Sequence, residues 1–157
     1  MTTSTTDLLE RTQFAVDMPP RVRETLAALG KVGDHEEGAV IVRAGVPCPA
    51  LGVILHGRIA IRQPIPGMGR RTILTLEDGD IFGWSAVLEG SSATSDAVAV
   101  APTRVILFER VALTEALEAD PRLAAAVYQR VLSAVARRLQ STRMQLLDLY
   151  RAGDEPW

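Results

Sequence analysis

Six short apolar runs, each followed by a turn, fill the middle of the chain and limit its fold more than any other feature. Glycines at 38, 45, 57 and 79 stand in the turns, where the backbone often needs a positive φ. Short, evenly spaced runs of this kind indicate an antiparallel sandwich or barrel rather than alternating strands and helices. The runs are residues 39–42, 51–55, 58–62, 71–76, 96–100 and 104–108.

Helical patterns precede this β region. After a polar tail, we expect a short helix that Asp7 caps and that ends near Val16. The proline pair at 19–20 breaks it and opens a second helix over residues 21–29, which Gly30 ends.

The helical period returns after residue 109. One helix is predicted over residues 111–118, and Asp120 followed by Pro121 marks the start of a long helix that runs to about residue 151. A shorter helix is expected inside the β region, at residues 84–88. We therefore divide the chain into a tail and short helix (1–19), one domain with its long helix (20–151) and a tail (152–157).

The long helix carries two apolar stripes. A seam with alternating spacings of three and four is typical of a helix that packs on a partner helix, which predicts a homodimer. The alternative is that the seam covers its own barrel. The seam contains Ala125, Tyr128, Leu132, Val135, Leu139, Thr142, Leu146 and Leu149, and the second stripe, expected to pack on the β region, contains Leu123, Val127, Val131 and Ala134.

Composition excludes several classes of protein. The net charge is −2, which argues against direct DNA binding. The single cysteine, Cys48, excludes an internal disulfide and a multi-cysteine metal site. No signal peptide and no apolar stretch of membrane-spanning length is apparent, so we expect a cytoplasmic, bacterial protein without membrane contact.

The order of these elements resembles the cyclic-nucleotide-binding domain family. The resemblance rests on the glycines at 38, 45, 57, 79 and 83, on the segment Gly-Asp-Ile-Phe-Gly at 79–83, and on residues 132–142, which are similar to the dimer helix of bacterial cyclic-AMP receptor proteins. It implies a mainly β fold, a double-stranded β-helix or jelly roll of eight strands. N-terminal helices and a long C-terminal dimerisation helix would flank the roll.

The resemblance also implies a phosphate-binding cassette after residue 82. In the family, a glutamate after the glycine binds the ribose hydroxyl and an arginine about ten residues later pairs with the phosphate. Here Trp84 and Ala93 stand at those two positions, so the cassette is degenerate. An indole donates a hydrogen bond but accepts none, so it cannot replace the carboxylate. The implied ligand-binding residues of the cassette are Phe82, Gly83, Trp84, Ser85, Ala86, Ala93, Thr94 and Ser95.

The base of the ligand would lie against a second group of residues. By resemblance these are Ile61, Leu74, Leu76, Arg138, Thr142 and Arg143. Thr142 has an alternative role, since a polar residue in an apolar seam also sets the register of a dimer.

These features predict a stand-alone regulatory domain that senses cyclic AMP or another nucleotide-like ligand and signals through its dimer or a protein partner. One alternative is a ligand-free dimeric interaction module, with Trp84 filling the pocket. Another is a relative of transcription regulators that has lost its DNA-binding domain. An enzyme is not predicted: Ser85 sits in a partial nucleophile-elbow pattern, but both histidines lie upstream of it. No metal site is predicted either.

Overall fold

The computed structural model describes residues 3–153 and contains two four-stranded sheets packed as a roll. Every pair of neighbouring strands is antiparallel. One sheet has the order β1 (Gly30–His35), β8 (Thr103–Glu109), β3 (Ala50–His56), β6 (Ile81–Phe82). The other has the order β2 (Val40–Val42), β7 (Asp96–Ala99), β4 (Ile59–Ile65), β5 (Gly69–Leu76). The predicted mainly β roll with flanking helices is confirmed.

All six predicted runs are strands, whereas β1 and β6 have no apolar run of their own. β1 is Gly-Lys-Val-Gly-Asp-His, and it is held by a six-residue register with β8, from Gly30–Phe108 to His35–Thr103. β6 is two residues long and pairs with β3. Both strands depend on their partners, which is why the local pattern does not reveal them.

The core lies between the two sheets. Phe82 is fully buried and stacks on the backbone of β3, where a Cβ on Gly52 would come 2.1 Å from its ring. Only glycine allows the strand and the ring to approach so closely. The core continues under the N-terminal helices through Phe14, whose ring centroid lies 6.2 Å from that of Phe108.

The first helix begins earlier and ends sooner than predicted. α1 spans Thr5–Glu10, and its N-cap is Ser4. Asp7 is the third residue of the helix and closes a capping box with Ser4, so the prediction that Asp7 is the cap was wrong. The Thr12 hydroxyl donates to the Leu9 carbonyl, and this side chain bond competes with continuation of the helix to Val16.

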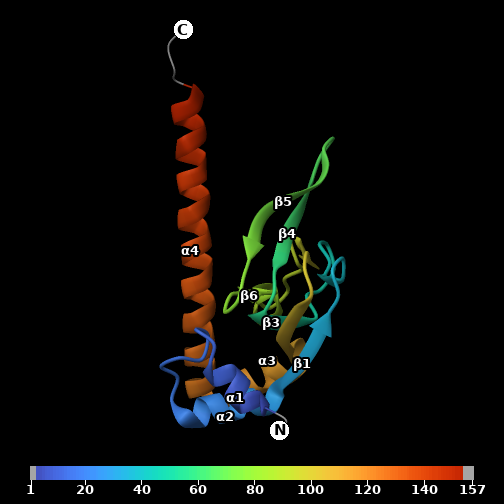
Figure 1. Cartoon of the computed structure of the whole chain (residues 1–157). Coiled ribbons are helices and arrows are strands. Elements are labelled where there is room, and N and C mark those ends of the chain that lie inside the picture. The colour runs from blue at the N-terminus through green and yellow to red at the C-terminus, as the bar shows by residue number, and fades with distance from the viewer. Residues whose placement is uncertain (1–2, 154–157) are drawn as a thin grey trace.

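The remaining helices follow the prediction closely. α2 spans Pro20–Leu29, the short η1 spans Trp84–Val87 as a 3₁₀ turn, α3 spans Arg110–Ala119 and α4 spans Pro121–Gly153. Asp120 caps α4, since its carboxylate accepts from the N–H groups of Arg122 and Leu123. Figure 1 shows α4 running alongside the roll and continuing to the far end of the molecule, with the β4–β5 hairpin extending in the same direction. Between residues 3 and 153, no helix is long and apolar enough to cross a membrane.

Candidate functional site

A half-open cavity of about 200 Å³ lies between the β roll, η1 and α4. Its walls come from β2, β4, β5, η1, the loop before β3, the start of β7 with the segment before it, and one side chain of α4. Most of its surface is apolar, and the polar groups are small except for one arginine. The lining residues are Val42, Cys48, Ile61, Gln63, Ile73, Leu74, Gly83, Trp84, Ser85, Ala93, Thr94, Ser95, Ala97 and Arg138.

Gly83 turns the chain from β6 into η1 at the wall of this cavity. Its φ is +70°, in the left-handed region, and a Cβ there would lie 2.3 Å from the Ala50 carbonyl oxygen. Both the conformation and the space therefore require glycine. The first 3₁₀ bond runs from the Ala86 N–H to the Gly83 carbonyl (3.0 Å), and it leaves the N–H groups of Trp84 and Ser85 at the open end of the turn.

Cys48 connects the turn to the strand beneath it. Its thiol is fully buried, and its single S–H is shared between the carbonyls of Ala50 and Gly83, each 3.4 Å from Sγ. Burial raises the pKa of Cys48, although the backbone hydrogen bonds and the charge of Arg110 act in the opposite direction. The thiol is therefore protonated at neutral pH and adds no charge to the cavity.

The segment before β7 forms the opposite wall. Ala93 is buried, and its backbone is tied to the loop after β2 by two hydrogen bonds, from its N–H to Val46 (2.9 Å) and from the Gly45 N–H to its carbonyl (2.8 Å). Thr94 and Ser95 follow it along the cavity wall. This segment supplies hydroxyl groups and no charge.

Asp96, the next residue, points to the other face of the sheet. Its side chain is 3% exposed, accepts from the Ala44 N–H at 2.8 Å and pairs with Arg70 of β5. Since successive side chains of a strand face opposite sides, Ser95 and Ala97 reach the cavity while Asp96 does not. The carboxylate fixes the loop and the hairpin that frame the site.

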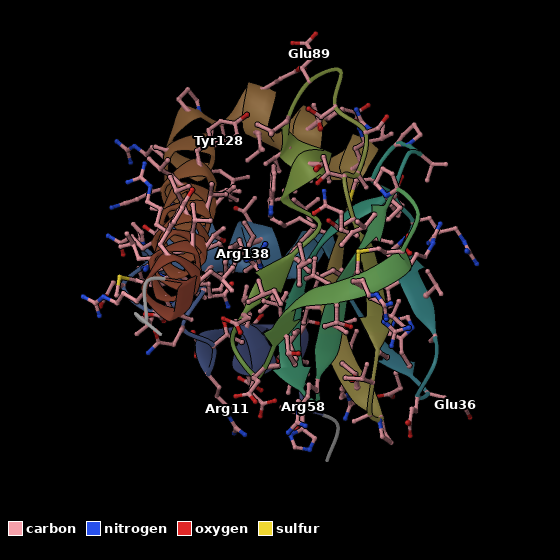
Figure 2. The ribbon with its side chains drawn as sticks, turned by 90° about the horizontal axis from the view of Figure 1, so that it is seen from above. Arg11, Glu36, Arg58, Glu89, Tyr128 and Arg138 are labelled. Carbon is pink, nitrogen blue, oxygen red and sulfur yellow. The ribbon has the colours of Figure 1, made fainter. Side chains whose placement is uncertain are left out.

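Arg138 enters the cavity from α4 and bonds to the Ile81 carbonyl of β6. Figure 2 shows it on the side of α4 that faces the roll. Burial lowers the pKa of Arg138, with Arg137 acting in the same direction and Asp80 opposing both. Arginine nevertheless remains protonated in proteins, so this side chain brings a positive charge to the cavity.

Most of the residues predicted for the site are brought together around this cavity. The ones that line it are Gly83, Trp84, Ser85, Ala93, Thr94, Ser95, Ile61, Leu74 and Arg138. Residues 61, 84, 95 and 138 are far apart in the sequence, and the fold brings them to one cavity as the predicted grouping requires. Their role toward a ligand stays a prediction.

Five predicted site residues lie outside the cavity lining. Phe82, Ala86 and Leu76 are buried in the hydrophobic core. Thr142 and Arg143 lie further along α4 and are exposed, and the Thr142 hydroxyl donates to the Arg138 carbonyl of its own helix at 2.9 Å. Neither side chain lines the cavity of its own chain, and both lie on the exposed outer part of α4.

Five lining residues were not predicted: Val42, Cys48, Gln63, Ile73 and Ala97. The alternation of strand side chains could have indicated Gln63, two residues after Ile61, and Ala97, two residues after Ser95. Ile73 joins Leu74 on the same wall because the register between β4 and β5 shifts at Ile61 and Arg62. No local sequence pattern predicts such a bulge.

The two stripes of α4 separate as expected. Leu123, Val127, Val131 and Ala134 are buried against the roll. The seam faces away from the core: Leu132 is 69% exposed and Leu149 is 70% exposed, and only Val135 of the predicted dimer residues is partly buried. Within one chain, the seam therefore does not cover its own barrel. The exposed members are Tyr128, Leu132, Leu139, Thr142, Leu146 and Leu149.

Solved structures share this fold. A cyclic nucleotide-binding domain from Methylobacillus flagellatus KT matches with a TM-score of 0.78 and 22% identity, over 92% of this chain and 82% of that one. A putative cyclic nucleotide-binding protein from Geobacter metallireducens GS-15 matches with a TM-score of 0.76 and 23% identity, over 88% of this chain and 99% of that one. At these identities the likeness shows the fold alone.

Sequence comparisons lead to the same family. A putative potassium channel protein of Rhodopseudomonas palustris is 29% identical over 119 residues, which cover 76% of this chain but only 28% of the channel. The family model described as "Cyclic nucleotide-binding domain" matches residues 34–120, more than half of the 157 residues. The chain therefore belongs to the cyclic nucleotide-binding domain family.

Proposed function

We propose that the chain is a regulatory ligand-binding module: a small nucleotide-like ligand occupies the cavity beside η1, and α4 transmits the occupancy to a dimer or protein partner. The observation that carries this proposal is the double role of α4. One face reaches the cavity through Arg138, and another carries the exposed seam. Domains of this family are regulatory rather than catalytic, so we propose no enzymatic activity.

The seam supports a homodimer through α4. At 1.5 Å per residue, the helix is about 50 Å long, and every residue from 139 to 153 is exposed. Apolar side chains at regular helical spacing on a free helix form a surface that monomers rarely leave open. A second α4 would bury that surface with coiled-coil geometry.

A degenerate phosphate-binding cassette is part of this proposal. Trp84 occupies the cavity wall where the family has a ribose-binding carboxylate, and Ala93 leaves no phosphate-pairing cation there. Hydrogen bonds to charged groups contribute about 1.5–3 kcal/mol each. Loss of both would weaken cyclic-nucleotide binding by about 10²–10⁴-fold relative to an intact cassette.

Calorimetric titration with cyclic AMP and cyclic GMP tests the ligand. We expect measurable but weak binding to the wild-type protein, and a higher affinity for the double variant Trp84→Glu, Ala93→Arg, because that variant restores both anchors. Absence of heat up to millimolar nucleotide, in a sample whose unfolding transition is intact, would remove cyclic nucleotides as ligands.

A ligand-free dimeric interaction module is the second candidate. It is favoured by the small cavity, since about 200 Å³ is below the range of about 300–1,000 Å³ usual for ligand pockets, and Trp84 forms part of its wall. This candidate predicts that no nucleotide changes the oligomeric state or partner association, even of the double variant. Light scattering with and without nucleotide distinguishes the two.

A further inference from the structure

The charge of the cavity comes from one side chain. Of the residues that line it, only Arg138 is charged, and the neutral polar groups are those of Gln63, Ser85, Thr94 and Ser95, the indole N–H of Trp84 and the protonated thiol of Cys48. Asp96, the nearest carboxylate in sequence to this wall, faces the other side of the sheet and pairs with Arg70. The cavity is therefore positive and lacks an acidic side chain among its lining residues.

Arg138 has unused donors. A guanidinium offers five N–H donors in a planar fork, and one of its nitrogens donates to the Ile81 carbonyl. Within residues 3–153, Arg138 has no carboxylate within 4.0 Å. Exposed Arg70, in contrast, pairs with Asp96. Asp80 acts on the charge of Arg138 but forms no ion pair with it, so this partly buried cation still favours an incoming anion, because few waters compete for it.

The rest of the cavity suits a flat apolar body. Ile61 and Leu74 form one wall and Trp84 another, and an indole face stacks on planar rings. An acceptor for sugar hydroxyls is missing at position 84, since the indole only donates. The lining therefore favours a ligand with a planar ring and a negative charge. It contains no carboxylate that could bind a ribose hydroxyl.

We infer that Arg138 is the anion anchor of this cavity, and that its ligands are flat aromatic monoanions held by α4 rather than by the cassette strand. The inference rests on the proposed function and names the chemistry of its ligand. The anion is a carboxylate or a cyclic phosphodiester on a planar ring system. Because its counter-charge sits on α4, the ligand connects the helix to η1 directly, alongside the bond from Arg138 to Ile81.

Calorimetry with three probes tests the inference: 2-naphthoate, its neutral amide 2-naphthamide, and cyclic AMP. We expect naphthoate to bind at least about 10-fold more tightly than the amide. Arg138→Gln is expected to weaken both anions about 10- to 100-fold and to leave the amide unchanged, as for the loss of one charge-assisted bond. The stronger of the two anions shows whether carboxylate or phosphodiester is preferred.

Arg137→Gln is the matched control, because it removes the same charge one residue away, on an exposed side chain that does not line the cavity. It should leave all three affinities unchanged. Arg138→Lys keeps the charge without the fork and should fall between wild type and Arg138→Gln. Urea unfolding of each variant shows whether the loss of the Ile81 bond has altered the fold.

Three results would overturn the inference: equal binding of naphthoate and naphthamide, unchanged anion affinity in folded Arg138→Gln, or no anion binding at millimolar concentration. The second result, with cyclic AMP bound, leaves the proposed function standing and moves the anchor elsewhere. Absence of anion binding would also contradict the ligand-binding part of the proposed function. The dimer is tested separately, by measuring the mass of the protein in solution.

Discussion

Replacement of Gly83 by alanine should destabilise the protein more than the same change at any open glycine of similar conformation. Gly83 has φ +70° and its added Cβ would lie 2.3 Å from the Ala50 carbonyl oxygen and 3.2 Å from Cys48 Sγ. Gly67, at the tip of the β4–β5 hairpin, has φ +76° with nothing within 4 Å of the added Cβ. The pair therefore separates the cost of conformation from the cost of space.

The magnitudes follow from these two terms. A left-handed alanine costs about 1–2 kcal/mol, which is the whole expected loss for Gly67→Ala. Gly83→Ala adds the displacement of backbone in a packed core, about 1–3 kcal/mol, so we expect a total loss of about 2–5 kcal/mol. For a domain of this size, each 1 kcal/mol lowers the Tm by about 2–4 °C.

Urea unfolding followed by circular dichroism measures both variants, at one protein concentration so that any dimer contribution is held equal. Gly83→Ala should lose at least about 1 kcal/mol more than Gly67→Ala. Equal losses would refute the close approach of η1 to β3, and with it the geometry of the cavity wall.

Three further predictions concern the seam, the buried carboxylate and the thiol. Leu139→Glu with Leu146→Glu should convert a dimer into a folded monomer by light scattering, whereas Gln140→Glu should not; a monomeric wild type would contradict the proposed dimer. Asp96→Ala should cost about 1–3 kcal/mol in urea unfolding, because the Ala44 N–H loses its acceptor, while Glu77→Ala, which breaks an exposed pair with Arg58, should cost under about 1 kcal/mol. Burial raises the pKa of the Cys48 thiol above its ordinary value of 9.0, so the unfolded thiol ionises first as the pH rises and the folded state loses stability above about pH 9. The stability difference between wild type and Cys48→Ala should therefore shrink between about pH 8 and 10, and a constant difference would argue against the buried thiol.

The fold was largely predictable because its elements carry local signals. Apolar runs closed by glycine turns gave six of the strands, and the four glycines at 38, 45, 57 and 79 all have positive φ. Asp120 and Pro121 correctly marked the start of α4. β1 and β6 were not predicted because β1 lacks an apolar run and β6 is only two residues long, so both are recognised only by their pairing with β8 and β3.

The site was predictable in part, for similar reasons. The resemblance grouped Gly83, Trp84 and Ala93, and all three line the cavity, with Ala93 on the wall opposite Gly83 and Trp84. It did not show that Thr142 lies outside the cavity lining of its own chain, nor that Asp96 faces the other side of the sheet. Cavity shape depends on strand register and helix placement, which are tertiary properties that residue spacing alone does not determine.

Native mass spectrometry of the purified protein, titrated with cyclic AMP and with 2-naphthoate, tests most directly whether the cavity serves a dimeric sensor. We predict a mass of two chains that takes up two anions at saturation, and a loss of that uptake in Arg138→Gln. A single-chain mass that retains neither anion, in a sample with an intact unfolding transition, would contradict both the ligand site and the role of α4.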